Sequence, residues 1–144
     1  MTQIRDVMTK EVETCSQSDR IYDVALKMKE WDVGVIPVVE NDRLMGVLTD
    51  RDIVLRCIAE KKPPSSKVEE IMSERLITVS PDTTTQEATR LMAKEQIRRL
   101  PVVENGKLVG IVALGDLAVR DLTDSLAKQA LSEISEDDGE QALH

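Results

Sequence analysis

The 144-residue chain contains one structural unit twice. Aligning Pro37 with Pro101 sets an offset of 64 residues, and that offset holds without a gap over 4–56 and 68–120. The identical pairs include Met8 and Met72, Thr14 and Thr78, Ser16 and Ser80, Met28 and Met92, Leu44 and Leu108, Gly46 and Gly110, Asp52 and Asp116, and Arg56 and Arg120. Because both copies should adopt the same fold, this repeat constrains the architecture before any local pattern is considered.

Each unit has the patterns of a β-α-β-β-α fold. Apolar residues at helical spacing predict one helix, and short β-branched runs predict the strands. Asn105-Gly106, and more weakly Asn41-Asp42, separate two apolar runs and predict tight hairpins. The expected elements are turns over 4–8 and 68–72, strands over 12–14 and 76–79, helices after polar stretches at 16–19 and 80–82, strands over 35–39, 44–48, 100–103 and 108–112, and helices near residues 50 and 114.

Neither unit is large enough to fold alone. About fifty residues with roughly three strands bury too little apolar surface, so we expect the copies to pack sheet to sheet around a pseudo-two-fold axis in an α/β fold. Paired prolines in Lys61-Lys62-Pro63-Pro64 predict a stiff linker. The predicted boundaries are 1–60 for the first repeat, 61–67 for the linker, 68–131 for the second repeat with a C-terminal helix through Leu122, Leu126, Ala130 and Leu131, and 132–144 for a frayed acidic tail.

Composition excludes several functional classes. A net charge of −8, with one Trp, one Tyr and no Phe, argues against a nucleic-acid partner. No apolar run reaches membrane-spanning length and the N-terminus lacks a signal-peptide core, so we expect no membrane contact and a cytoplasmic location. Cys15 and Cys57 have no C-x-x-C spacing and His144 is the only histidine, which predicts buried free thiols and no metal site.

The segment Gly46–Asp52 reads as a strand that runs into a helix start. The first amides of a helix lack partners within it, so they can bind an anion such as phosphate. Thr49 adds a hydroxyl donor, and Asp52 adds a carboxylate that can accept from two ribose hydroxyls. The alternative is a capping box, with Thr49 as the N-cap and Asp52 reaching back to it, which requires no ligand.

The two copies together resemble a tandem pair of CBS domains, the regulatory module first recognised in cystathionine β-synthase. The resemblance rests on the unit order, the Leu/Ile-Pro-Val-Val strand and Gly-x-x-Thr-x-x-Asp before the last helix, and it covers about residues 4–120. It is similar to the stand-alone bacterial kind. The family implies adenosine-containing ligands in clefts between the repeats: AMP first, with ATP, NAD or S-adenosylmethionine as the others, and no required cofactor.

The resemblance also implies roles for individual residues. Asp52 and Asp116 would hold ribose hydroxyls, Thr49 would contact phosphate, and adenine would lie near Ile36-Pro37 and Leu100-Pro101. The second copy departs from the pattern, because Ala113 stands where the first has Thr49. We therefore expect the site of Thr49 and Asp52 to bind more tightly.

Phosphate also needs a cation, and Arg98 and Arg99 precede Leu100-Pro101 on the strand expected to line the cleft. The alternative is that one of them forms a surface ion pair. Arg51 either joins the phosphate or points to solvent.

These observations predict a non-catalytic regulatory module that binds an adenine nucleotide, forms a homodimer and acts on an unidentified partner protein. The alternative is a ligand-free scaffold for protein association. An enzyme is disfavoured, because the chain has no phosphate-binding loop, no dinucleotide fingerprint, no metal-ligand cluster and no histidine placed as a base.

Overall fold

The computed structural model describes residues 2–119 and 129–130. The C-terminal helix expected through Leu122, Leu126 and Leu131, and the acidic tail, lie outside the described residues. In chain order the elements are η1 (Ile4–Asp6), α1 (Ile21–Trp31), β1 (Val35–Glu40), β2 (Arg43–Thr49), α2 (Asp50–Asp52), η2 (Ile53–Ile58), η3 (Val68–Glu70), α3 (Thr85–Glu95), β3 (Arg99–Glu104) and β4 (Lys107–Ala113), followed by helix over 114–119. η1 and η3 are 3₁₀ turns, and η2 is a π-helix that continues α2.

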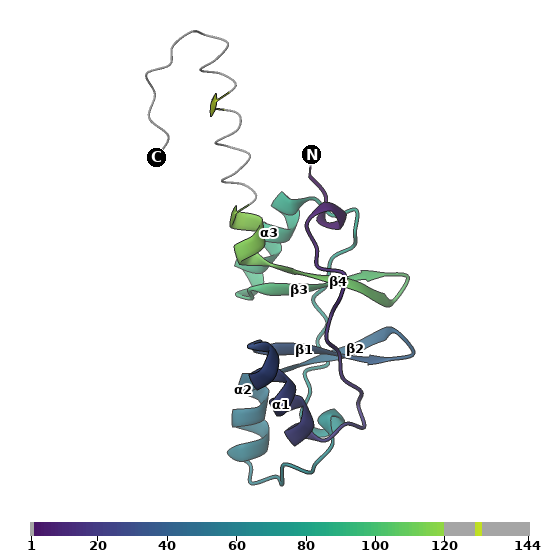
Figure 1. Cartoon of the computed structure of the whole chain (residues 1–144), viewed down its shortest axis with the longest axis vertical. Helices are drawn as coiled ribbons and strands as arrows, with labels where there is room; N and C mark the ends of the chain where they lie inside the picture. The colour runs from purple at the N-terminus through teal and green to yellow at the C-terminus, as the bar shows by residue number, and fades with distance from the viewer. Residues whose placement is uncertain (1, 120–128, 131–144) are drawn as a thin grey trace.

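Two antiparallel hairpins, β1–β2 and β3–β4, form the centre of the protein (Figure 1). Both turns have positive φ at their two central residues, which are Asn41 and Asp42 in the first hairpin and Asn105 and Gly106 in the second. Positive φ at both positions is the type I′ geometry that suits the right-handed twist of paired strands. Both hairpin predictions are confirmed.

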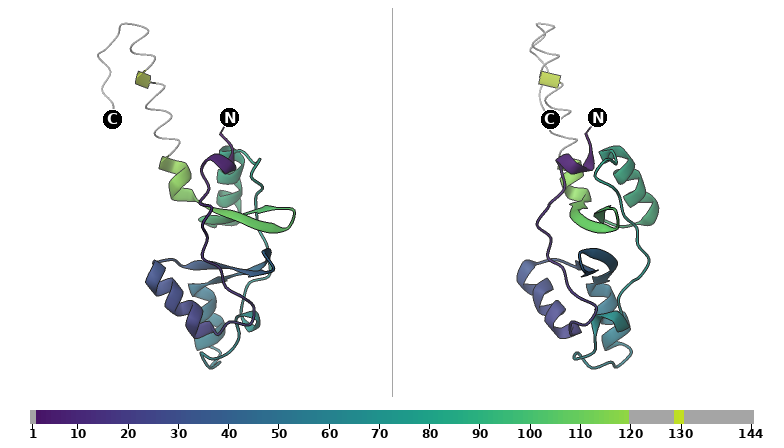
Figure 2. Two further views of the ribbon diagram at one scale, coloured as in Figure 1. Left: turned by 45° about the vertical axis from the view of Figure 1, so that its right-hand side comes forward. Right: turned by 90° about the vertical axis from the view of Figure 1, so that its right-hand side faces the viewer.

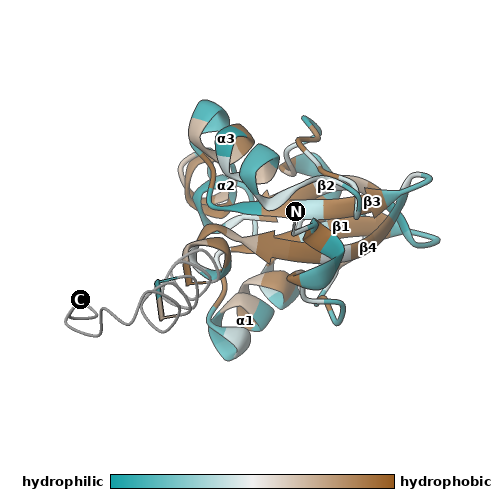
Figure 3. Cartoon of the chain, turned by 90° about the horizontal axis from the view of Figure 1, so that it is seen from above, coloured by the Kyte–Doolittle hydropathy of each residue, from teal (hydrophilic) through white to brown (hydrophobic). Residues whose placement is uncertain are grey.

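The two hairpins meet at their turns. Arg43 of β2 pairs with Lys107 of β4, so the strand order is β1-β2-β4-β3. The amide of Leu108 donates to the carbonyl of Asp42 at 2.9 Å, and that of Leu44 to the carbonyl of Gly106 at 3.2 Å. In Figure 1, α1 and α2 lie beyond one hairpin and α3 beyond the other, so the helices cover the outer sides. Figure 3 shows the strands largely apolar and the hairpin turns polar. The predicted α/β fold of two packed repeats is confirmed.

Each repeat has its own hydrophobic core, and each core is completed by the 3₁₀ turn that begins the other repeat. This leading turn is η3 for the first core and η1 for the second. Val68, Ile71 and Met72 are buried in the first core, with α1 and β1. Ile4 is fully buried in the second core, with α3 and β3. Figure 2 shows the N-terminal segment running from one end of the molecule to the other. The repeats therefore exchange their first turns, and neither core is complete without the other repeat.

The segments that follow these turns run close to β2 and β4. Val47 and Ser73 exchange two backbone hydrogen bonds of 3.0 and 2.8 Å, and Thr9 and Ile111 form the matching pair in the other repeat. A Cβ on Gly46 would lie 2.5 Å from the carbonyl oxygen of Ser73. The glycine of the Gly-x-x-Thr-x-x-Asp motif is therefore required by this close approach of two backbones.

One local prediction needs correction. The strands expected over 12–14 and 76–79 are absent, and single parallel bridges join Cys15 to Val38 and Val79 to Val102 instead. These segments cross β1 and β3 briefly and then turn toward a helix, so no ladder of hydrogen bonds develops. The helices that follow begin at Ile21 and Thr85, directly after the polar stretches, as predicted.

Cys15 and Cys57 are buried free thiols, as predicted. Burial raises the pKa of the Cys15 thiol to about 12, and the nearby Asp19 carboxylate adds to the shift. Cys15 therefore stays protonated at neutral pH, which argues against a reactive thiol at this position. Within residues 2–119 and 129–130, no helix has the length and apolar character needed to cross a bilayer.

Candidate functional site

A cleft of about 610 Å³ lies between the two hairpins. It is lined by Gly34, Val35, Pro37, Val47, Thr49, Asp50, Ser73, Arg75, Leu76, Ile77, Ile97, Arg98, Arg99, Pro101 and Ile111. All four strands contribute, together with the start of α2 and the segment that leads from η3 into the second repeat. Its volume falls in the range of roughly 300–1,000 Å³ typical of small-molecule pockets. We call it the basic cleft because three arginines line it.

Three guanidinium groups and one carboxylate line the basic cleft, so its charge is positive although the chain is acidic. Arg98 and Arg99 are exposed, and their side chains have no hydrogen-bond or ion-pair partner within the part of the chain that the structure describes. Arg75 forms a 2.8 Å ion pair with Glu95, and its side chain is 76% exposed. Because Arg75 is largely exposed, solvent screens its pair with Glu95, whose own side chain is 17% exposed, and Arg75 can turn to an anionic ligand instead.

The helix start at Asp50 is not an open anion site. Its first three amides are already paired: that of Asp50 with the carbonyl of Gly34 at 3.0 Å, that of Arg51 with Asp50 Oδ1 at 2.8 Å, and that of Asp52 with Thr49 Oγ1 at 3.0 Å. The expectation that these amides are available for phosphate is therefore wrong. Positive charge in the cleft comes from the arginines.

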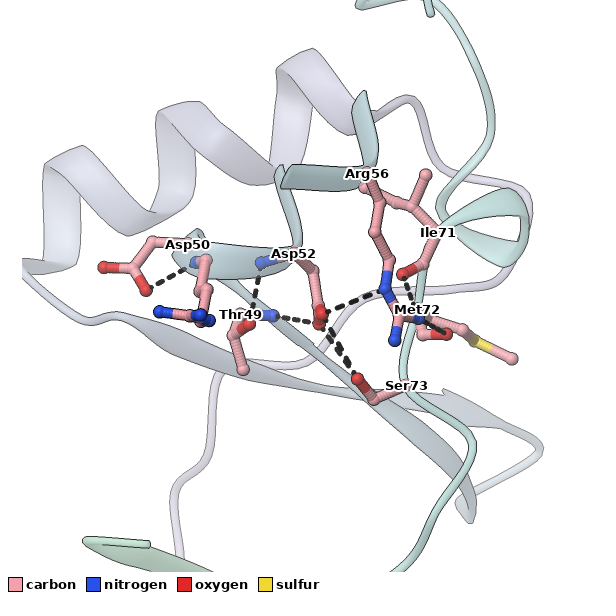
Figure 4. A network of polar contacts seen from close by, with 8 residues as sticks. Thr49, Asp50, Asp52, Arg56, Ile71, Met72 and Ser73 are labelled. Atoms are coloured by element: carbon pink, nitrogen blue, oxygen red, sulfur yellow. Dashed lines mark hydrogen bonds and ion pairs between the residues drawn. The ribbon is translucent and has the colours of Figure 1, made fainter. Parts of the chain in front are cut away.

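Asp52 is buried behind the wall of the basic cleft. Its carboxylate accepts from the amide of Thr49 at 3.0 Å and from Ser73 Oγ at 3.2 Å on each oxygen, and Arg56 Nε lies 3.8 Å away (Figure 4). With the bond from the Asp52 amide to Thr49, this completes the capping box, so that alternative is confirmed. Since Thr49 and Ser73 both line the cleft, Asp52 holds two parts of its wall together.

The structure brings five predicted site residues to the basic cleft: Pro37, Thr49, Arg98, Arg99 and Pro101. Ile36 and Leu100 are fully buried, because their side chains face the cores. Arg51 and Asp116 are exposed and line none of the described clefts. With Ala113 in place of a hydroxyl, Asp116 lacks the capping partner that Asp52 has, and its carboxylate has no hydrogen bond to any described residue.

The residues that sequence reasoning missed lie mainly in one segment, Ser73–Ile77, with Gly34 and Asp50 beside it. Ser73 reaches the cleft through its bridge to Val47, a contact between the two repeats. Gly34 leaves space for Asp50, since a Cβ at position 34 would lie 3.0 Å from Asp50 Oδ2. In the sequence, Arg75 is marked by a difference between the repeats, because the matching position in the first repeat holds a glutamate, Glu11. Among the described residues, no group of three or more His, Cys, Asp or Glu side chains is arranged to hold a metal.

A duplicated unit of a helix, a β-hairpin and a second helix that encloses a cleft between its copies defines a tandem-domain module. The chain belongs to the CBS domain family, whose family model matches residues 4–58 and 68–122. These two ranges carry the same repeat offset found in the sequence.

Relatives and solved structures of this family resemble most of the chain. The uncharacterized protein YlbB and the CBS domain-containing protein YhcV, both of Bacillus subtilis, are 49% and 47% identical to it, covering 96% and 94% of this chain and 95% and 96% of theirs. The structure of CBSX2 in complex with AMP has a TM-score of 0.77 at 27% identity and covers 87% of this chain and 99% of its own.

Two further structures extend the comparison to other ligands. The CBS domain pair of protein MJ0100, in complex with 5′-methylthioadenosine and S-adenosyl-L-methionine, has a TM-score of 0.72 at 28% identity and covers 81% of this chain and 97% of its own. Hypoxic Response Protein I with two coordinated zinc ions has a TM-score of 0.76 at 34% identity, with coverage of 83% and 99%. Members of this fold thus bind different small ligands.

Proposed function

We propose that this protein is a non-catalytic regulatory module that binds an adenosine-containing nucleotide in the basic cleft. The observation that carries the proposal is a positive cleft between the repeats of an acidic chain, with Arg98 and Arg99 unpaired among the described residues. Two exposed guanidinium groups without protein partners suit a phosphate, which accepts several hydrogen bonds from each. The adenosine ligands of CBSX2 and of the MJ0100 domain pair support the class of ligand.

The proposal gives each part of the cleft a role. Phosphate binds Arg98 and Arg99, with Thr49 and Arg75 beside it, and the base packs between the apolar side chains of Pro37 and Pro101. The ribose hydroxyls reach Asp52 by replacing the Ser73 hydroxyl at its carboxylate, so the Asp52 oxygens keep hydroxyl donors. AMP is the first ligand to test, followed by ATP, NAD and S-adenosylmethionine.

Calorimetric titration of the full chain with AMP tests this function. We expect AMP to bind, and Arg98→Ala to weaken its affinity about tenfold through the loss of one charge-assisted contact. Arg90→Ala is the matched control, because Arg90 is an exposed arginine on α3 that lies outside the cleft. If AMP, ATP, NAD and S-adenosylmethionine all fail to bind below millimolar concentration, the proposal is wrong.

The second candidate is a ligand-free scaffold for protein association. It is favoured by one observation, that the helix-start amides and Asp52 are already satisfied within the protein. A thermal-unfolding screen separates the two functions, since a ligand that binds the folded state raises the melting temperature in step with its concentration. A melting temperature that no adenosine ligand changes would favour the scaffold.

We further propose that the module forms a homodimer through α1 and η2 and acts in the cytoplasm. Tyr22, Leu26, Val54, Leu55 and Ile58 on these two helices are between 44% and 60% exposed. Clustered exposed apolar residues commonly mark an interface. Sedimentation is expected to show a dimer at micromolar concentration and a monomer for Ile58→Glu, with Met45→Glu on β2 as the control. A monomeric unmodified chain would contradict this proposal.

A further inference from the structure

A second cleft, of about 420 Å³, lies on the other side of the same hairpins. It is lined by Thr9, Glu11, Val12, Glu13, Trp31, Val33, Val35, Ile36, Pro37, Arg99 and Ile111. The segment Thr9–Glu13 occupies in this cleft the place that Ser73–Ile77 occupies in the basic cleft, since the repeat offset relates the two segments. The two clefts are therefore equivalent by internal symmetry, and their side chains can be compared position by position.

The comparison shows a reversal of charge. Glu11 stands where the basic cleft has Arg75, and Glu13 stands where it has Ile77. Neither glutamate has an ion-pair partner in the described part of the chain, so both charges remain uncompensated. Among the residues that line this cleft, Arg99 is the one with a positive charge, and Arg99 lines both clefts. We call this second pocket the acidic cleft.

The acidic cleft also contains an aromatic surface that the basic cleft lacks. Trp31 lines it and is 55% exposed, and the matching residue in the second repeat is Glu95, the partner of Arg75. In the second repeat, the residues at these two positions are Arg75 and Glu95, which form an ion pair. In the first repeat, they are Glu11 and Trp31, so a negative charge and an exposed indole line the same cleft. An exposed indole provides a face on which a purine base can stack.

We propose that the two clefts sort nucleoside ligands by charge. The basic cleft takes a phosphorylated nucleotide, and the acidic cleft takes an uncharged or positively charged nucleoside that packs on Trp31 and carries no phosphate. The first half rests on the proposed function, whereas the second half is an independent assignment. The physical basis is Coulombic: phosphate oxygens near Glu11 and Glu13 are repelled, while a cationic group there is attracted.

Trp31 makes the acidic cleft directly observable, because it is the only tryptophan in the chain. Its fluorescence, excited at the red edge of its absorption where adenine does not absorb, reports on that cleft and not on the basic one. The probes are adenosine, AMP and ATP, which share one nucleoside and differ in the number of phosphate groups and therefore in charge, and S-adenosylmethionine, which carries a positive sulfonium group. We expect adenosine and S-adenosylmethionine to change the fluorescence at concentrations about tenfold lower than AMP requires.

The double variant Glu11→Gln with Glu13→Gln tests whether the two glutamate charges cause the preference for adenosine over AMP. It removes both charges and keeps the side-chain size. The half-effect concentration of AMP, at which half of the full fluorescence change is reached, should therefore fall about tenfold toward that of adenosine. The matched control is Glu60→Gln with Glu69→Gln, two exposed glutamates outside the cleft, which should leave the ratio unchanged. Raising the salt concentration should shrink the difference between AMP and adenosine in the unmodified chain, because ions screen exposed charges.

Two readouts keep the two proposals separate. Equal half-effect concentrations for adenosine and AMP, or no fluorescence response to adenosine, would overturn the sorting of ligands. Absence of AMP binding by calorimetry would overturn the proposed function of the basic cleft, whatever Trp31 shows. Calorimetric binding of AMP that leaves Trp31 unchanged, together with a fluorescence response to adenosine, would support both.

Discussion

Replacing Gly46 by alanine is expected to lower the free energy of unfolding by about 3 kcal/mol, at the upper end of the cost of overpacking. The new Cβ would lie 2.5 Å from the carbonyl oxygen of Ser73, which accepts the hydrogen bond from Val47. A backbone oxygen cannot rotate away as a flexible side chain can. The segment entering the second repeat must therefore shift and weaken the bridge, and with it one wall of the basic cleft. Urea denaturation measures the change.

Gly115→Ala is the matched control for this prediction. A Cβ at Gly115 meets nothing within 4 Å, and the residue lies in the helix over 114–119. Alanine is favoured over glycine in a helix by up to about 1 kcal/mol, so this variant should be neutral or more stable than the unmodified chain. Equal losses of stability in both variants would show that the close approach at Gly46 is not the cause.

Asp52→Ala is expected to lower the free energy of unfolding by about 2 kcal/mol. The substitution removes the carboxylate that accepts from the Thr49 amide and from Ser73 Oγ, and that pairs with Arg56. Loss of a capping interaction costs about 1 kcal/mol, and donors left without partners in a partly buried site add a similar amount. Chemical denaturation of the unmodified and substituted chains provides the measurement.

The internal repeat provides the control, Asp116→Ala. Asp116 is the symmetry mate of Asp52, but it is exposed and its carboxylate has no hydrogen bond to any described residue. Its removal should change stability by about 0.5 kcal/mol at most. A loss as large as that of Asp52→Ala would contradict the structural role assigned to the capping box. Because Asp52→Ala loosens Thr49 and Ser73, a loss of AMP affinity in this variant would not by itself prove contact with the ribose, and Arg98→Ala is the cleaner test.

The sequence alone determined the architecture of this protein. The repeat offset is read by comparing the chain with itself, and the Asn-Asp and Asn-Gly turns and the start of a helix at Asp50 depend on residues close together in the chain. The structure has each of them. Thr49, Arg98 and Arg99, which the motif and the family resemblance assigned to the site, line the basic cleft. Such features follow from backbone preferences and short-range spacing, which a single sequence displays directly.

Only the tertiary structure decided the exchange of the first turns and the composition of the two clefts. Ile4 packs in the second core and Val68 in the first, so each leading segment is carried across to the other repeat. That crossing brings Arg75 into one cleft and Glu11 into the other, and gives the clefts opposite charge. These contacts join residues far apart in the chain, and they form because each core is completed by the other repeat's apolar turn. No pattern within one unit contains that information.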